Sequence, residues 1–202
     1  MSEDLQPDRR RKRNSAATKE AILQAAMKLF VDRGFDAATV RDIADLAGVN
    51  QALLFRYFGS KEELFDVAVS RRALAQLDET PPDRLIEVIL RELLAVGPGA
   101  GSDQIVKAIL LSTGQPGTVS AGRKQVRDGY TDALATLSGA PDARLRASLL
   151  LAWLLGIGIA RHITEDQNIV AADFGDICAV VTGVAKNLLA ATSSPRSDGD
   201  RA

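Results

Sequence analysis

The stretch of sequence that decides the fold is TVRDIADLAGVNQALLFRYFGSKEEL, which runs from Thr39 to Leu64. Thr39 followed three residues later by Asp42 is typical of the start of a helix, and Asn50 can cap a second one. Gly48 precedes that second helix and suits a tight turn that needs an unusual backbone angle. Two short helices joined by a three-residue turn that contains Gly are the layout of a helix-turn-helix. The stretch therefore predicts a motif whose second helix can enter the major groove of DNA.

Apolar residues within this stretch recur at helical spacing, which indicates that they form a core. Ala44 and Ala47 are small enough for the two helices to cross closely. The residues assigned to this core are Ile43, Ala44, Ala47, Val49, Leu54 and Phe58. The second helix then keeps one face free, with its N-terminal residues placed to lie nearest the base edges.

Apolar periodicity and capping residues on either side of the stretch predict about nine helices and no convincing strand. The expected helices cover Ser15 or Thr18 to Arg33, then 39–47, 51–57, 61–77, 83–96, 103–113, 118–137, 142–164 and 173–191. The low aromatic content of 4%, together with abundant Ala and Leu, also favours helices over sheets. The chain is therefore expected to be all-α, with a three-helix N-terminal helix-turn-helix domain and a C-terminal helical domain.

Composition shifts along the chain suggest four segments. We expect a disordered basic arm over 1–14, the helix-turn-helix domain over 15–61, the C-terminal domain over 62–192 and a disordered tail over 193–202. The arm carries the run Arg9–Arg13, which has no apolar period. This run could be a solubilising tail, or it could reach phosphates or a minor groove and add salt-dependent affinity for DNA.

Charge is distributed unevenly, although the net charge is only −1. The first 61 residues contain 11 Lys and Arg against 8 Asp and Glu, whereas the remaining residues contain 14 against 18. A mildly basic head on an acidic body fits a protein that touches DNA at one end only.

Several classes of protein are disfavoured by the residues present. The single cysteine, Cys178, excludes an intrachain disulfide and fits a reducing cytoplasm. With the single histidine, His162, it leaves too few ligands for a zinc site, which takes about four. No catalytic constellation or Gly-rich phosphate loop is evident, so we expect neither an enzyme nor a cofactor. The longest apolar run, 149–160, is shorter than the roughly 20 residues of a membrane span and is interpreted as a buried helix.

The segment from about Thr18 to Val69 resembles the DNA-binding domain of the tetracycline-repressor (TetR/AcrR) family. The resemblance is carried by Gly34-Phe35, Thr39, Ile43-Ala44, Ala47-Gly48-Val49, Phe55-Arg56-Tyr57-Phe58 and Lys61 to Leu64. It implies a cytoplasmic, homodimeric transcriptional regulator with helix-turn-helix heads. It further implies a repressor that a small apolar or amphipathic effector releases from a palindromic operator.

The resemblance also assigns roles to individual residues. The DNA-contacting positions are Thr39, Arg41, Asn50, Gln51, Ala52, Leu53, Phe55, Arg56, Tyr57 and Lys61. Thr39, Tyr57 and Lys61 would hold phosphates and fix the register of the protein on the duplex. Arg41 would reach a guanine edge, and Gln51 could pair bidentately with adenine.

The sequence departs from the family pattern in the recognition helix. Phe55 stands where the family usually has Tyr, so one phosphate hydrogen bond is missing, and the charge of the adjacent Arg56 can replace it. Leu53 replaces a residue that is commonly small or hydroxylated. Ala52 and Leu53 would then make apolar contacts, for example with a thymine methyl group.

The C-terminal domain is implied to bind a second copy and an effector. Helix 142–164 is apolar nearly all round over 149–160 and needs cover on more than one side. The expected dimer interface consists of Ala152, Gly156, Ala160, Phe174, Ile177, Val181, Val184 and Leu188. An effector pocket would be lined by Leu85, Ile89, Leu93, Leu110, Trp153 and Ile157, with Arg127, Tyr130 and Arg161 as polar groups. The apolar residues of this set can be interpreted at least as well as ordinary core residues that line no pocket.

Two other functions remain open. An architectural DNA-binding protein would need no effector and would show little sequence preference, which Arg41, Gln51 and the acidic body disfavour. A helical small-molecule-binding protein with a vestigial helix-turn-helix would lack salt-dependent affinity for DNA.

Overall fold

The structure is a computed structural model that describes the backbone of residues 6–94 and 121–190, and the side chains from Ser15 onward within these ranges. Every regular element among the described residues is helical, which confirms the all-α fold. The elements are α1 (Gln6–Arg33), α2 (Val40–Ala47), α3 (Gln51–Phe58), α4 (Lys61–Glu79), the 3₁₀ turn η1 (Pro82–Arg84), α5 (Leu85–Leu94), α7 (Ala121–Ala135), α8 (Ala143–His162), α9 (Gln167–Ala171) and α10 (Phe174–Leu189).

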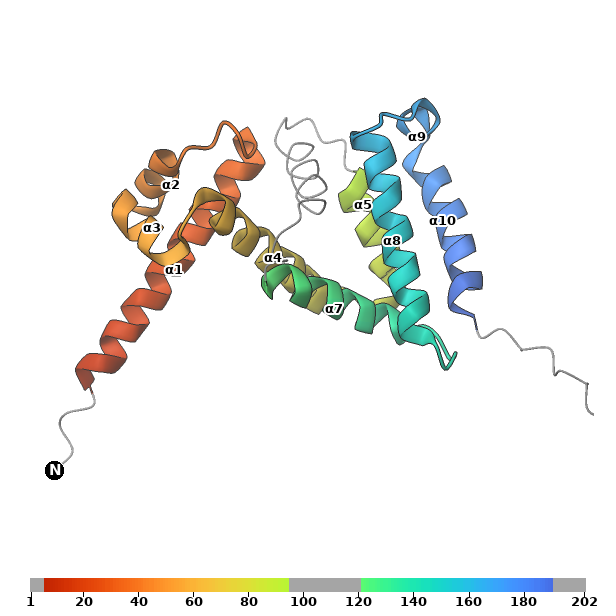
Figure 1. The fold of residues 1–202 in the computed structure, drawn as a ribbon, viewed down its shortest axis with the longest axis horizontal. Helices are drawn as coiled ribbons and strands as arrows, with labels where there is room; N and C mark the ends of the chain where they lie inside the picture. The colour runs from red at the N-terminus through yellow and green to blue at the C-terminus, as the bar shows by residue number, and fades with distance from the viewer. Residues whose placement is uncertain (1–5, 95–120, 191–202) are drawn as a thin grey trace, which may run out of the picture.

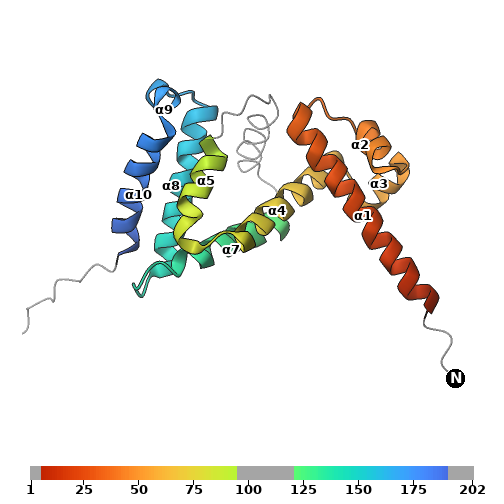
Figure 2. The same cartoon turned by 180° about the vertical axis from the view of Figure 1, so that it is seen from behind.

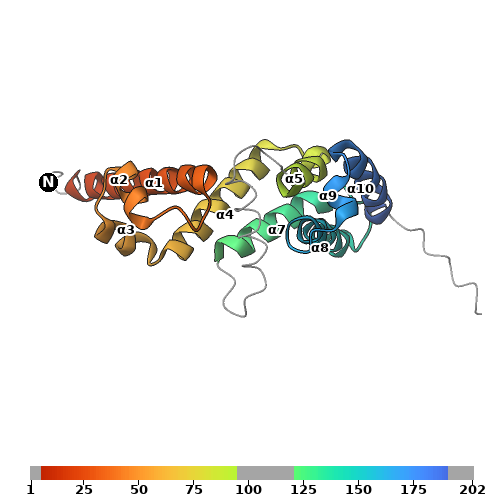
Figure 3. The ribbon, with the colours of Figure 1, turned by 90° about the horizontal axis from the view of Figure 1, so that it is seen from above.

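The described helices form an elongated molecule with a group of helices at each end (Figure 1). α1, α2 and α3 lie together at one end, and α5, α8 and α10 lie together at the other. α4 runs from the first group toward the second, and α7 lies alongside it (Figure 2). From above, the two groups follow one another along the molecule with α4 and α7 between them (Figure 3).

The N-terminal group has its own apolar core. Phe30, Phe35 and Phe65 pack ring against ring, with the Phe65 ring edge-on to the other two at centroid distances of 5.1 and 4.9 Å. The fully buried side chains around this cluster include Ile22, Ile43, Leu54 and Leu64. α4 therefore belongs to the N-terminal group through its first turns, although it continues toward the second group.

A second core joins α5, α7, α8 and α10. It is built from side chains that are fully or almost fully buried, namely Leu85, Ile86, Leu90, Leu94, Leu134, Ala147, Leu150, Leu154, Val181, Ala185 and Leu189. Apart from the adjacent pair Leu85 and Ile86, successive members on α5, α8 and α10 are three or four residues apart, which is the spacing of an apolar helix stripe.

The start of α1 differs from the prediction, whereas its end agrees. The helix begins at Gln6, so the expected disorder of the first 14 residues is wrong from Gln6 onward. Helix propensity explains the difference, because the basic run contains strong helix formers and Pro7 is tolerated in a first turn. The helix ends at Arg33, and Gly34 follows with φ of +83° and an N–H bond to the Phe30 carbonyl at 2.9 Å.

One short helix between α8 and α10 was not predicted. Asp166 caps α9, since its Oδ1 accepts hydrogen bonds from the N–H groups of Asn168 and Ile169 at 2.9 and 3.2 Å. The expected helix over 103–113 and the expected tail over 193–202 lie outside the described residues. The other expected helices are present, with ends that differ by a few residues.

α8 is less buried than its composition suggested. Its inner face packs in the second core, but Leu149, Leu155 and Ile159 are exposed, Leu149 to 51%. The segment 149–160 was interpreted as a buried helix. In a single chain this interpretation is wrong for the outer face of α8. By length and composition α8 could also span a membrane, a test that apolar helices of soluble proteins pass as well.

Candidate nucleic-acid interface

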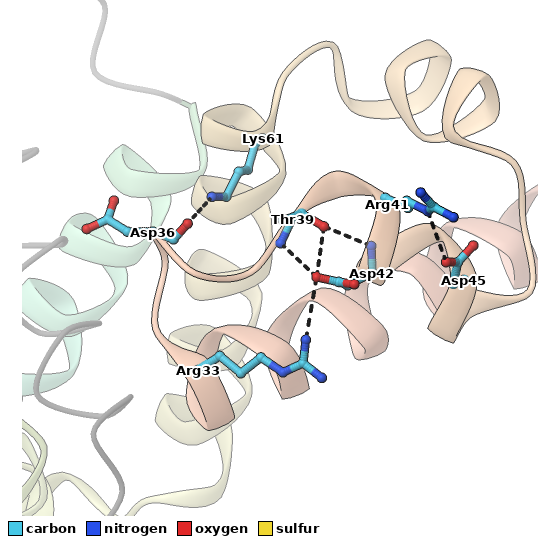
Figure 4. A network of polar contacts seen from close by, with 7 residues as sticks. All are labelled: Arg33, Asp36, Thr39, Arg41, Asp42, Asp45 and Lys61. Carbon is cyan, nitrogen blue, oxygen red and sulfur yellow. Dashed lines mark hydrogen bonds and ion pairs between the residues drawn. The ribbon is translucent and has the colours of Figure 1, made fainter.

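The start of α2 is held by a reciprocal capping box. The Thr39 hydroxyl oxygen accepts a hydrogen bond from the Asp42 N–H at 3.1 Å, and an Asp42 carboxylate oxygen accepts one from the Thr39 N–H at 3.4 Å. The Thr39 hydroxyl also donates to the same carboxylate oxygen at 2.8 Å (Figure 4). The cap satisfies N–H groups that α2 would otherwise leave unpaired, so the predicted start of the helix is confirmed.

The turn between α2 and α3 depends on Gly48. Its φ of +67° lies in the left-handed region, and its N–H bonds to the Asp45 carbonyl at 3.2 Å. The next N–H, that of Val49, bonds to the Ala44 carbonyl at 2.9 Å. These bonds close the end of α2 and direct the chain into α3.

α3 presents a defined outer face. The Asn50 side-chain oxygen caps the helix by accepting a hydrogen bond from the Leu53 N–H at 2.7 Å. Leu54 and Phe58 point into the core and fix the rotation of the helix about its axis. The exposed residues are Gln51, Ala52, Phe55 and Arg56.

Two ion pairs involve residues of α2 (Figure 4). Arg33 lies 3.4 Å from Asp42, and the Arg41 Nε lies 3.9 Å from Asp45. The Thr39 hydroxyl bond, followed by the nearby arginines, holds the pKa of Asp42 below its usual range, so this carboxylate stays ionised. The Arg41 side chain is 79% exposed. Because an exposed pair of this kind is weak, the Arg41 guanidinium can leave Asp45 for a stronger partner.

Tyr57 and Lys61 connect α3 and α4 to neighbouring segments. The Tyr57 hydroxyl donates to the Ser15 oxygen on α1 at 3.1 Å, and the Lys19 ammonium lies 5.3 Å from the centre of the tyrosine ring. The bond to Ser15 is the main cause that lowers the pKa of Tyr57. The Lys61 ammonium donates to the Asp36 carbonyl at 3.4 Å (Figure 4). The same ammonium lies 4.4 Å from the Phe35 ring centre.

The ten predicted DNA-contacting residues lie on α2 and α3, at their N-caps or, for Lys61, at the start of α4. Seven are exposed, and Leu53, Tyr57 and Lys61 are half-buried. Sequence reasoning missed Ser15 and Lys19, which lie on α1 beside Tyr57. No local pattern could reveal them, because the Ser15–Tyr57 contact joins residues 42 positions apart.

The predicted effector residues are distributed between the core and the surface. Leu85 is fully buried in the second core, and Ile89, Leu93, Trp153 and Ile157 pack partly buried around it. Leu110 lies outside the described residues.

The polar residues of that set already have partners within the chain. The Tyr130 hydroxyl donates to the Ala73 carbonyl of α4 at 3.1 Å, and burial raises its pKa. The Arg161 guanidinium donates to the Ile169 carbonyl at 2.9 Å. Arg127 is exposed and lies 3.4 Å from Asp128. Of the three, only Tyr130 is both partly buried and in contact with α4.

The predicted dimer residues do not share one surface. Ala152, Gly156 and Val184 are exposed, whereas Val181 is 3% exposed and packs in the chain's own core. The half-buried ones are Ala160, Phe174, Ile177 and Leu188. The exposed large apolar residues of α10 are Val184, which was predicted, and Val180, which was not. The apolar spacing of α10 thus described its inner face, which covers α5 and α8.

Comparison with known proteins places the whole of this arrangement in one family. Residues 22–68 match the family described as bacterial regulatory proteins, tetR family, and residues 83–189 match the tetracyclin repressor-like C-terminal domain. The chain is 31% identical over 77 residues to the HTH-type transcriptional repressor AcnR of Corynebacterium efficiens, an alignment that covers 38% of this chain and 40% of AcnR. It is 39% identical over 85 residues to the HTH-type transcriptional repressor Rv3405c of Mycobacterium tuberculosis, covering 37% and 45% of the two chains.

These alignments span less than half the length of the curated relatives. The fold is similar over a longer range to that of a solved TetR transcriptional regulator from Rhodococcus sp. RHA1. The TM-score is 0.63 at 20% identity, covering 88% of this chain and 97% of that one. The C-terminal family match alone covers more than half of the 202 residues. This chain therefore belongs to the TetR family of bacterial regulatory proteins.

Proposed function

We propose that the protein is a sequence-specific DNA-binding transcriptional regulator of the cytoplasm, acting as a homodimer on a palindromic operator. The observation that carries this proposal is the outer face of α3, which the buried Leu54 and Phe58 hold in one orientation. The relatives AcnR and Rv3405c are themselves named as transcriptional repressors, which supports the same role here. The proposed activity is binding, with no chemical step.

Recognition would use two kinds of contact. Gln51 lies in the first turn of α3, where its amide can donate to and accept from an adenine edge at once. The exposed Arg41 can reach a base or a phosphate. Thr39 and Lys61 flank this face and would contact DNA phosphates, which fixes the position of the protein on the duplex without reading the base sequence.

The apolar surface at the far end of the molecule supports a homodimer. α8 and α10 carry the exposed side chains Leu145, Leu149, Leu155, Ile159, Val180 and Val184, the last two at 65% and 47% exposure. Ala152 and Gly156 lie among them on α8 and permit close approach of a second helix. A twofold axis here would pair the same patch on both copies and leave the two α3 helices free at the outer ends (Figure 1).

Effector release would act through α4. This helix contributes to the N-terminal core, and its later turns pack against α7. Asp66 on α4 pairs with Arg123 in the first turn of α7, and the Arg123 Nε–Asp66 Oδ1 distance is 3.1 Å. A small apolar or amphipathic effector would bind in the C-terminal helices. It would release the protein from DNA if it bound more tightly to the conformation in which the spacing of the two α3 helices does not fit the operator.

The first prediction concerns base reading by α3. Gln51→Ala should weaken binding to operator DNA by about 1–3 kcal/mol, because a bidentate contact with a base is lost. Binding is measured with labelled DNA from the region upstream of the coding sequence, at physiological salt, with excess non-specific competitor. Gln125→Ala is the matched control, since this exposed glutamine lies on α7, away from the interface.

The outcomes separate the possible functions. Tight binding that survives competitor and weakens only in Gln51→Ala supports a sequence-specific regulator. Equal and weak binding to any DNA, unchanged by Gln51→Ala, would indicate an architectural protein. A protein that binds no DNA even at low salt would contradict both and leave a small-molecule-binding protein.

A further inference from the structure

The outer face of α3 has an apolar centre between two polar edges. With 3.6 residues per turn, the order of the exposed side chains around the helix is Gln51, Phe55, Ala52 and Arg56. The Phe55 ring and the Ala52 methyl group therefore lie between the Gln51 amide and the Arg56 guanidinium. The Phe55 side chain is 47% exposed, although Leu54 and Phe58 beside it are buried.

An exposed phenylalanine is informative here because of its position. Isolated apolar side chains are common on protein surfaces and by themselves indicate nothing. In the major groove, however, the C5-methyl group of thymine is the apolar feature of the base edges, beside hydrogen-bond donors and acceptors. A phenyl ring facing N7, O6 or N4 of a G·C pair would displace water from these atoms and offer no hydrogen bond in return.

We propose that the Phe55 ring, with Ala52 beside it, reads a pyrimidine C5-methyl group in each operator half-site. This inference rests on the proposed function of sequence-specific binding. Gln51 lies next to Phe55 around the helix, so a neighbouring adenine would complete the contact. Thymine supplies the methyl group in unmodified DNA, and 5-methylcytosine presents the same group at the same place in the groove.

The test removes the methyl group from the DNA and the ring from the protein. Operator duplexes are selected from random-sequence DNA with the full chain, and each thymine is then replaced by deoxyuridine in both half-sites. Deoxyuridine keeps the base pair and its acceptor oxygen and loses only the methyl group. For at least one thymine position, we expect the replacement to weaken binding about fourfold in each half-site, which is the effect of losing one buried methyl group. Because the palindrome contains two half-sites, its total affinity should fall about 16-fold.

The same substitution in DNA should have no effect on a protein that lacks the ring. Phe55→Ala is expected to bind the thymine and deoxyuridine duplexes equally, and Phe55→Ser should behave in the same way. Leu46→Ala is the matched control, because Leu46 is an apolar side chain of α2 with a similar exposure of 50%. This control should retain the full deoxyuridine effect. Circular dichroism checks that each variant is folded.

A second arm separates the methyl group from the base that carries it. At the same position, 5-methylcytosine should bind more tightly than cytosine to the unaltered protein and equally to Phe55→Ala. A deoxyuridine effect of the same size in Phe55→Ala, or no effect at any thymine in the unaltered protein, would overturn the proposal while leaving sequence-specific binding intact. Selection that enriches no sequence at all would instead overturn the proposed function itself.

Discussion

A few residues that precede α3 determine the direction in which this recognition helix starts. Gly48 takes a left-handed conformation, and Asn50 closes the first turn of α3 through its side chain. Both roles follow from residue chemistry, since glycine reaches this region without steric cost and an asparagine oxygen pairs with a free helical N–H. Single residues therefore determine how Gln51 and Phe55 are presented.

The conformation of Gly48 leads to a stability prediction. Gly48→Ala should lower the free energy of unfolding by about 1–2 kcal/mol, because a Cβ is strained at φ of +67°. Outside Gly48 and its two chain neighbours, no heavy atom lies within 4 Å of the position that this Cβ would take, so the cost comes from the local backbone conformation. Urea unfolding at constant protein concentration measures it.

Gly139→Ala provides the matched control for this prediction. Gly139 also has open space at its Cβ position, and its φ lies outside the left-handed region. Its replacement should change stability by less than about 0.5 kcal/mol. Equal effects of the two substitutions would show that backbone strain is not the cause.

Contacts between whole helices hold the body together, and one arginine joins α8 to the end of α10. The Arg146 guanidinium donates to the carbonyls of Leu188 and Ala190 at 2.8 and 3.0 Å, and its Nε pairs with Asp142 at 2.7 Å. Its side chain is only 15% exposed. Because the last carbonyls of a helix have no partner within it, Arg146 closes the C-terminal end of α10.

Arg146→Met should therefore destabilise the protein by about 1–3 kcal/mol, since the carbonyls at the end of α10, of which that of Leu188 is half-buried, lose a charged donor while the apolar stem is kept. Arg144→Met is the control, because Arg144 lies on the same helix as Arg146 and its exposed pair with Asp132 of α7 should contribute between about 0 and 1 kcal/mol. Thermal unfolding of both variants at one protein concentration gives the comparison. A larger effect at Arg144 would contradict this account of the end of α10.

At the scale of the whole molecule, the two ends have different surfaces and different proposed partners. The N-terminal end carries the exposed face of α3, and the opposite end carries the apolar faces of α8 and α10 (Figure 1). α4 and α7 connect them through the Asp66–Arg123 pair and the Tyr130–Ala73 hydrogen bond. Within the residues that the structure describes, a change at the proposed dimer end can thus reach the proposed DNA-binding end through these two helices.

The dimer proposal predicts a change of oligomeric state. Leu149→Glu places a charge in the centre of the exposed α8 face and should shift the protein from dimer to monomer in sedimentation velocity. Its affinity for a palindromic operator should fall sharply, because only one head per particle remains. Leu46→Glu, at an equally exposed leucine of α2, should leave the protein dimeric. A dimer that persists in Leu149→Glu would place the interface elsewhere.

Local sequence was sufficient to predict the all-α fold, the helix-turn-helix and its caps, since each depends on residues within about four positions of one another. The capping box at Thr39, the turn at Gly48 and the cap at Asn50 were all predicted in this way and are confirmed. The start of α1 was missed because the prediction looked for apolar periodicity and gave no weight to the helix propensity of a basic run.

Which face of each apolar helix turns inward could not be obtained from the sequence. Val180, Val181 and Val184 are the same residue type on one helix, yet only Val181 is buried in the second core, because α5 and α8 pack against that side of α10. In the same way, the Tyr57 hydroxyl meets Ser15 only because folding brings α1 beside α3. Spacing along the chain defines the helices, whereas their faces are assigned by packing between residues far apart in sequence.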